Sequence, residues 1–73
     1  MYDAKIYLSN GTTINFPKLA TIHALRANGD REPVSPETFY VSDGLHYVFS
    51  SDTQIFSVPG KLLAYMAFTK INP

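Results

Sequence analysis

The stretch FYVSDGLHYVF, residues 39–49, places five rings around one tight turn when the imidazole of His46 is counted. A three-residue loop at 42–44 would make this stretch a β-hairpin that pairs Val41 with Leu45. One face of the hairpin would be a typical core face, formed by Phe39, Val41, Leu45, Tyr47 and Phe49. The opposite face would carry Thr38, Tyr40, His46 and Val48.

A further strand is expected to follow this hairpin through a three-residue loop at 51–53, in the segment IFSV, residues 55–58. This register puts Phe56 and Val58 on the second face of the hairpin, beside His46. That face would then be too apolar to contact water alone. We expect a cover for it from the segment 18–27, from the last segment of the chain or from a second molecule.

The N-terminal segment AKIYLSNGTTINF, residues 4–16, is a second hairpin candidate with two alternative loops. A two-residue Asn-Gly turn would put apolar and polar side chains on the same face. A three-residue loop, with Gly11 in a left-handed position, pairs Ile6 with Ile14 and separates apolar from polar side chains. We therefore predict the three-residue loop, with Pro17 ending the second strand.

The segment KLATIHALRANG, residues 18–29, spaces Leu19, Ile22 and Leu25 at three-residue intervals. This spacing indicates one short helix over 18–27, with Asn28-Gly29 as a left-handed cap. The following segment, GDREPVSP, is rich in charges and prolines and is expected to be a loop.

The last apolar segment, KLLAYMAFTKI, residues 61–71, has apolar side chains on both faces at either a helical or a strand period. Helix and strand therefore both remain open, although the short length and the preceding strand and Pro-Gly turn favour a strand. A strand that is apolar on both faces is typical of the middle of a barrel, a sandwich or a subunit interface. The fold class we predict is a small five-stranded antiparallel barrel or sandwich built from hairpins.

Few residues suggest catalysis or metal binding. His23 and His46 lack the spacing of a metal site, and the chain has no cysteine to complete one. The serines occur at predicted turns, where a short hydroxyl hydrogen-bonds nearby backbone, and no glycine-rich phosphate loop is found. We predict no enzyme activity, no metal and no cofactor.

Length and composition indicate one domain, residues 1–73, with no signal peptide and no apolar run long enough to span a membrane. The absence of cysteine favours a cytoplasmic location. The six basic and six acidic residues cancel, and five of the acidic residues lie between Asp30 and Asp52. Nucleic-acid binding is therefore disfavoured, because it needs a concentrated basic surface.

The function that we predict is that of a non-catalytic protein-binding or assembly module, such as an inhibitor, a regulator or an accessory subunit. A chain this short forms a small core, and self-association is a common way to stabilise one, so we expect a homo-oligomer. The contact residues that we predict are Tyr40, His46, Val48, Phe56, Val58 and Tyr65. The alternative is a weak nucleic-acid-binding protein that uses exposed aromatic rings with Lys5, Lys18, Lys61 and Lys70.

Overall fold

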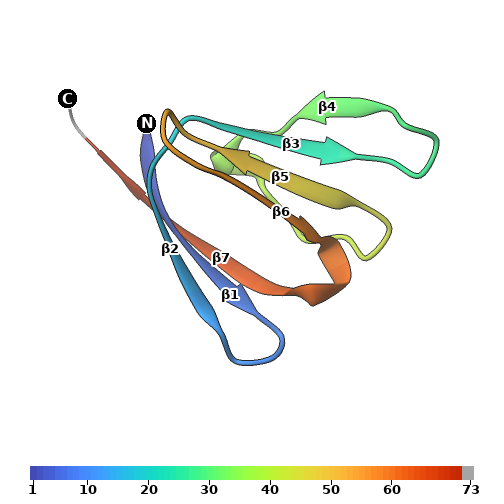
Figure 1. The fold of residues 1–73 in the computed structure, drawn as a ribbon, viewed down its shortest axis with the longest axis horizontal. Coiled ribbons are helices and arrows are strands. Elements are labelled where there is room, and N and C mark those ends of the chain that lie inside the picture. The colour runs from blue at the N-terminus through green and yellow to red at the C-terminus, as the bar shows by residue number, and fades with distance from the viewer. Residues whose placement is uncertain (72–73) are drawn as a thin grey trace.

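The computed structural model describes residues 1–71, which form seven strands and two short 3-10 turns. The elements are β1 (Tyr2–Leu8), β2 (Thr13–Leu19), β3 (Thr21–Leu25), β4 (Arg31–Pro33), η1 (Pro36–Thr38), β5 (His46–Ser50), β6 (Ile55–Pro59), η2 (Gly60–Leu62) and β7 (Leu63–Lys70). They make two antiparallel sheets, with strand orders β2-β1-β7 and β4-β3-β5-β6 (Figure 1). The mainly β prediction is confirmed. There are seven strands instead of five, however, and the two sheets do not close into a barrel.

The core lies between the two sheets. It consists of ten buried residues: Ala4, Ile6, Phe16, Leu19, Ile22, Ala24, Tyr47, Phe49, Val58 and Leu63. The rings of Phe16 and Phe49 connect the sheets, with centroids 6.5 Å apart. The accessible surface is 4788 Å², close to the roughly 4,500 Å² expected of a compact protein of this mass. Nine further apolar side chains are partly buried against the core, so one chain covers most of its large apolar side chains by itself.

The hairpin between β1 and β2 has the predicted register. Ile6 pairs with Ile14, and the Leu8 N–H donates to the Thr12 carbonyl at 2.9 Å around a three-residue loop. Gly11 in that loop has a φ of 91°, a conformation that a side chain disfavours.

The second strand does not end at Pro17, as predicted, but continues to Leu19. β2 lies at the edge of its sheet, where a proline needs no ladder partner. The register shifts next to it, between the pairs formed by Tyr2 and Ala4. The Lys18 N–H at this bulge donates to the Asp3 carboxylate at 3.0 Å instead of to another strand.

The predicted helix over 18–27 is wrong. This segment contains the end of β2 and all of β3, and no α-helix occurs anywhere in residues 1–71. Asn28-Gly29 forms a second three-residue hairpin loop, in which the Arg26 N–H donates to the Asp30 carbonyl at 2.8 Å and Gly29 has a φ of 93°. The loop predicted after Gly29 therefore contains the short edge strand β4.

Both Asn-Gly loops are held in the same way. In each, the asparagine side-chain oxygen accepts the N–H two residues further on, from Thr12 in the first loop and from Asp30 in the second, both at 2.9 Å. The spacing of Leu19, Ile22 and Leu25 also fits a helix, but this segment pairs with β5, and Asn-Gly then forms the loop of a hairpin.

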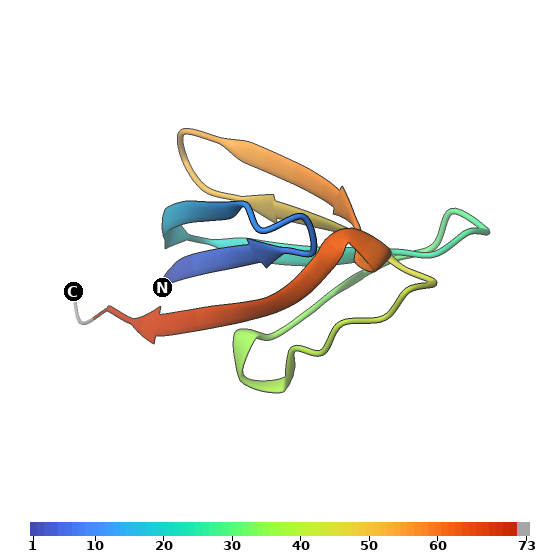
Figure 2. The same cartoon turned by 90° about the horizontal axis from the view of Figure 1, so that it is seen from below.

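The predicted hairpin at 39–49 does not form, because β5 begins only at His46 and residues 39–45 belong to no strand. The core role of these residues is nevertheless confirmed, because Tyr47 and Phe49 are buried and Phe39 packs against them. Figure 2 shows this segment running past β7 at one side of the molecule.

The register predicted for β5 and β6 is wrong by one residue. The connecting loop holds four residues, closed by the Ser51 N–H donating to the Gln54 carbonyl at 2.9 Å. Phe49 therefore pairs with Phe56 and Tyr47 with Val58. A shift of one residue exchanges the two faces of a strand, so Phe56 and Val58 point into the core.

The strand predicted in the last segment is confirmed, but it lies at an edge and not in the middle. β7 pairs with β1 alone, with Tyr65 opposite Tyr7 and Ala67 opposite Lys5. A register shift near Leu8 lets Leu63 reach the core. Within residues 1–71 there is no helix long and apolar enough to cross a membrane.

Candidate functional site

The six predicted contact residues lie on different surfaces. Phe56 and Val58 face the core, and Val58 is only 4% exposed. Val48 lies on the outer face of its sheet, on a strand flanked by β3 and β6. Tyr65 lies on the outer face of the other sheet and is 56% exposed. The apolar second face expected from the sequence is therefore not assembled.

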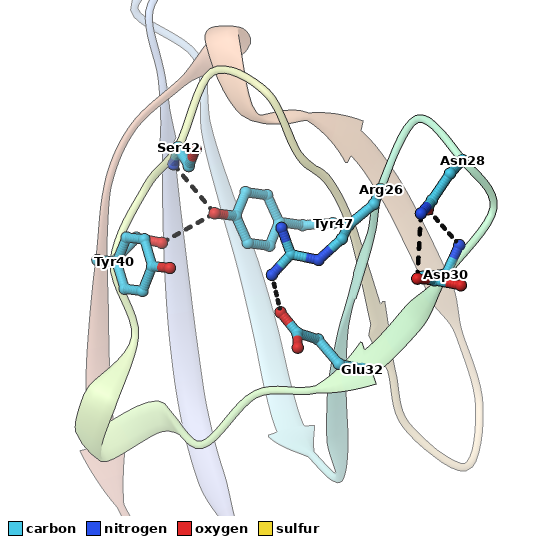
Figure 3. Close-up of polar contacts among 7 residues, drawn as sticks. All are labelled: Arg26, Asn28, Asp30, Glu32, Tyr40, Ser42 and Tyr47. Carbon is cyan, nitrogen blue, oxygen red and sulfur yellow. Dashed lines mark hydrogen bonds and ion pairs between the residues drawn. The ribbon is translucent and has the colours of Figure 1, made fainter.

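Tyr40 belongs to the irregular segment 39–45, whose backbone forms hydrogen bonds with the buried Tyr47 (Figure 3). The Tyr47 hydroxyl donates to the Tyr40 carbonyl at 2.9 Å and accepts the Ser42 N–H at 3.0 Å. Burial raises the pKa of the Tyr47 phenol above its ordinary value. The Tyr40 side chain itself extends into solvent and is 67% exposed.

The two histidines lie on neighbouring strands of the sheet β4-β3-β5-β6. His46 shares a hydrogen bond with Ser57, and His23 lies 3.4 Å from the Arg31 guanidinium. Three His, Cys, Asp or Glu side chains come together nowhere in the described part of the chain, as a metal site would need.

The outer face of the sheet β2-β1-β7 carries a pair of stacked tyrosines. The rings of Tyr7 and Tyr65 are 4.2 Å apart and nearly parallel, at 13°. A shallow hollow of about 560 Å³ lies on this face, beside Lys5, Asn15 and Thr69. Because β1 and β7 are far apart in the sequence, only the folded chain brings the two tyrosines together.

The two sheets leave four edge strands, β2 and β7 in one and β4 and β6 in the other. Three of these edges contain a proline, at Pro17, Pro33 and Pro59. Proline and short length are common protection against further strand pairing, because a proline has no N–H to donate. β4 has three residues and β6 has five, whereas β7 has eight and contains no proline.

The hydrogen-bond pattern shows that Pro33 and Pro59 occupy positions whose backbone groups point to the free side of their strands. In an antiparallel pair, alternate residues bond to the same neighbour. The Val34 N–H donates to the Ile22 carbonyl, and the Gly60 N–H donates to the Leu45 carbonyl. The backbone groups of the preceding residues, Pro33 and Pro59, therefore point away from the neighbouring strand, toward the open edge of the sheet.

The same pattern identifies the outward-facing backbone groups of β7. The Ile71 N–H donates to the Met1 carbonyl at 3.1 Å, so alternate residues before it also bond to β1. Met66, Phe68 and Lys70 then present their N–H and C=O groups on the free side. Among residues 1–71, none of these three forms a backbone hydrogen bond outside the ladder with β1.

The β7 edge was not foreseen from the sequence, although a signal for it existed. Prolines within strand-like runs mark edge strands, and 17, 33 and 59 are such positions, whereas 61–71 contains none. Comparisons of the chain with family models, with curated proteins and with solved structures find no match.

Proposed function

We propose that this protein is a non-catalytic module that binds protein partners, itself included, by strand addition to the free edge of β7. A single observation carries this proposal: among the edge strands of residues 1–71, β7 is the longest and the one without a proline. Strand addition to an exposed edge is a common mode of peptide and protein recognition.

The energetic support comes from the unpaired backbone groups of Met66, Phe68 and Lys70. Each backbone hydrogen bond that a partner strand makes contributes about 0.5–1.5 kcal/mol net of the water it replaces. Exposed apolar side chains next to the edge add to this. Tyr65 is the predicted contact residue that lies beside it, and we keep Tyr65 as a contact in this proposal.

Homo-oligomerisation now has a different basis from the one expected from sequence. Phe56 and Val58 are used by the core, and the surface of the chain is close to that of a compact monomer of its size. Self-association is therefore proposed through an edge and not through an apolar face. Tyr40, His46 and Val48 stay predictions as contact residues.

Amide hydrogen exchange across a concentration series tests the proposal. The Met66 and Phe68 amides should be poorly protected at low concentration and gain protection, with an increase in sedimentation mass, at about 100 μM. The outward-facing amides of Ile55 and Ser57 in β6 are internal controls and should not change.

A proline pair provides the matched variants. Lys70→Pro removes an outward N–H from β7, and Ile55→Pro does the same in β6 at a site that is 73% exposed. Only Lys70→Pro should weaken association. A wild-type chain that stays monomeric, with unchanged exchange at Met66 and Phe68, would contradict self-binding through this edge.

A further inference from the structure

The partner that best fits the β7 edge is another β7. We infer that two copies of the chain pair their β7 strands antiparallel, with Ala67 of both copies at the two-fold axis. This inference rests on the function proposed above and adds to it one occupant and one register. The result would be a continuous six-stranded sheet of order β2-β1-β7-β7-β1-β2, formed by the three-stranded sheet of each copy.

Symmetry restricts the possible registers. A two-fold axis perpendicular to the sheet keeps each face on its own side, so a residue on the axis must lie opposite itself. An axis at Ala67 allows all of 64–70 to pair within the eight-residue strand. An axis at Tyr65 or at Thr69 would leave one end of the strand without a partner.

Side-chain size favours Ala67 for the axis. Its backbone groups bond to β1, where it lies opposite Lys5, so across the new interface it forms a non-hydrogen-bonded pair. Such pairs bring the Cα atoms to about 4.5 Å, the closest approach in an antiparallel sheet. Two alanine side chains fit at that distance on the exposed face, and neither is needed in the core.

The neighbours of Ala67 are also complementary in this register. Met66 would lie opposite Phe68 of the second copy on the core side, a sulfur–aromatic pairing, and these residues are already half-buried. On the outer face Tyr65 would lie opposite Thr69. Lys70, which bears the only charge in β7, would lie opposite Ala64, so no like charges face each other.

An axis at Met66 fits less well. It would bring Lys70 opposite Leu62 of the second copy, next to Lys61, so that two cations come close. It would also place two Met66 side chains against each other. The interface at Ala67 is small, with about four hydrogen bonds between the Met66 and Phe68 pairs and up to about four more between the Ala64 and Lys70 pairs. We therefore expect a reversible dimer with a dissociation constant on the order of micromolar.

Cysteine cross-linking tests the register directly, because the chain has no cysteine of its own. Two cysteines at the axis would have Cα atoms within the 4.4–6.8 Å range of a disulfide. Ala67→Cys should therefore oxidise to a covalent dimer about ten times faster than Thr13→Cys, an exposed outer-face control on β2. Tyr65→Cys and Thr69→Cys should each cross-link poorly alone, and a mixture of the two should form the heterodimer.

The outcomes separate this inference from the proposed function. If the wild-type chain associates with protection of Met66 and Phe68, but Ala67→Cys cross-links no faster than Thr13→Cys, the register is wrong and edge binding stands. If the chain does not associate at all, self-binding fails together with the register. Efficient cross-linking of Ala67→Cys and of the mixed pair, with Tyr65→Cys alone slow, would establish the register.

Discussion

Replacing Tyr47 by phenylalanine removes one hydroxyl that holds the segment 39–45 against the core. The hydroxyl donates to the Tyr40 carbonyl at 2.9 Å and accepts the Ser42 N–H at 3.0 Å. The ring itself is buried and would keep its packing against Phe39 and Phe49. The variant thus isolates two hydrogen bonds from the apolar contribution of the same side chain.

The expected loss in the free energy of unfolding follows from those two bonds. Each contributes about 0.5–1.5 kcal/mol net, which gives a range of about 1–3 kcal/mol. Water can reach the Tyr40 carbonyl after the change, because Tyr40 lies at the surface, and this favours the lower half of the range. Urea unfolding at neutral pH should show a loss of about 1–2 kcal/mol, with Tm lower by several degrees.

Alkaline pH gives an independent readout of the same hydroxyl. Burial raises the pKa of Tyr47 above the ordinary value of 10.0, so the folded state keeps this proton to a higher pH than the unfolded state does. The associated stability is fully present below about pH 10 and is lost as the pH rises through the raised pKa. The difference in stability between wild type and Tyr47→Phe should therefore narrow above about pH 10.

Tyr7→Phe is the matched control, because Tyr7 lies on the outer face and its hydroxyl has no hydrogen-bond partner in residues 1–71. Tyr2 also has a raised pKa, because its hydroxyl donates to the Glu37 carboxylate at 3.1 Å, and it is present in both proteins. Its alkaline titration therefore cancels from the comparison. A Tyr47→Phe chain as stable as wild type at neutral pH, or a difference that stays constant into alkaline pH, would refute the reasoning.

Three further changes have clear expected results. Gly60→Ala should reduce the free energy of unfolding by about 3 kcal/mol or prevent folding, because the added Cβ would collide with the Ser42 and Leu45 carbonyls. Gly44→Ala has open space around the added Cβ, so urea titrations should give a free energy of unfolding within about 0.5 kcal/mol of wild type. Gly29→Ala should reduce the free energy of unfolding by about 1–2 kcal/mol, because Gly29 has a φ of 93°. Gly29→Asn should reduce it by less, since asparagine tolerates the left-handed region, and equal melting temperatures for the two variants would contradict this order. Single-stranded DNA or RNA should bind only weakly at about 0.15 M salt, because the basic and acidic residues balance, so submicromolar affinity by fluorescence anisotropy would favour the nucleic-acid alternative.

The parts of the fold that were predicted correctly depend on local chemistry. In the segment 4–16, the Ser-Asn-Gly loop and the alternation of Ile6 and Ile14 agree on one register, and the structure has that register. The segment 18–29 contains the same Asn-Gly signal, but the spacing of its apolar residues also fits a helix. Its pairing partner β5 lies about twenty residues further on in the sequence, and only that pairing excludes the helix.

The register of β6 shows where local reasoning ends. Ile55 and Phe56 are adjacent and both apolar, so loops of three and of four residues each put one of them on the core face. The choice depends on which of the two side chains packs against Phe49 in the folded core, and that side chain is Phe56. The predicted contact surface depended on the other register and was lost with it.

By itself, the sequence determined that the chain is mainly β and that residues 4–16 form a hairpin with a three-residue loop, because turn chemistry and side-chain alternation act over a few residues. For the last apolar segment, the sequence favoured a strand but left a helix open. It also contained a signal for the protected edges, because Pro17, Pro33 and Pro59 lack an N–H. Only the tertiary structure decided that β7 pairs with β1 and has a free side, and that Phe56 and Val58 face the core. Those features depend on contacts between strands far apart in the sequence, and the free energy of these contacts is realised only when both sheets pack around the same core.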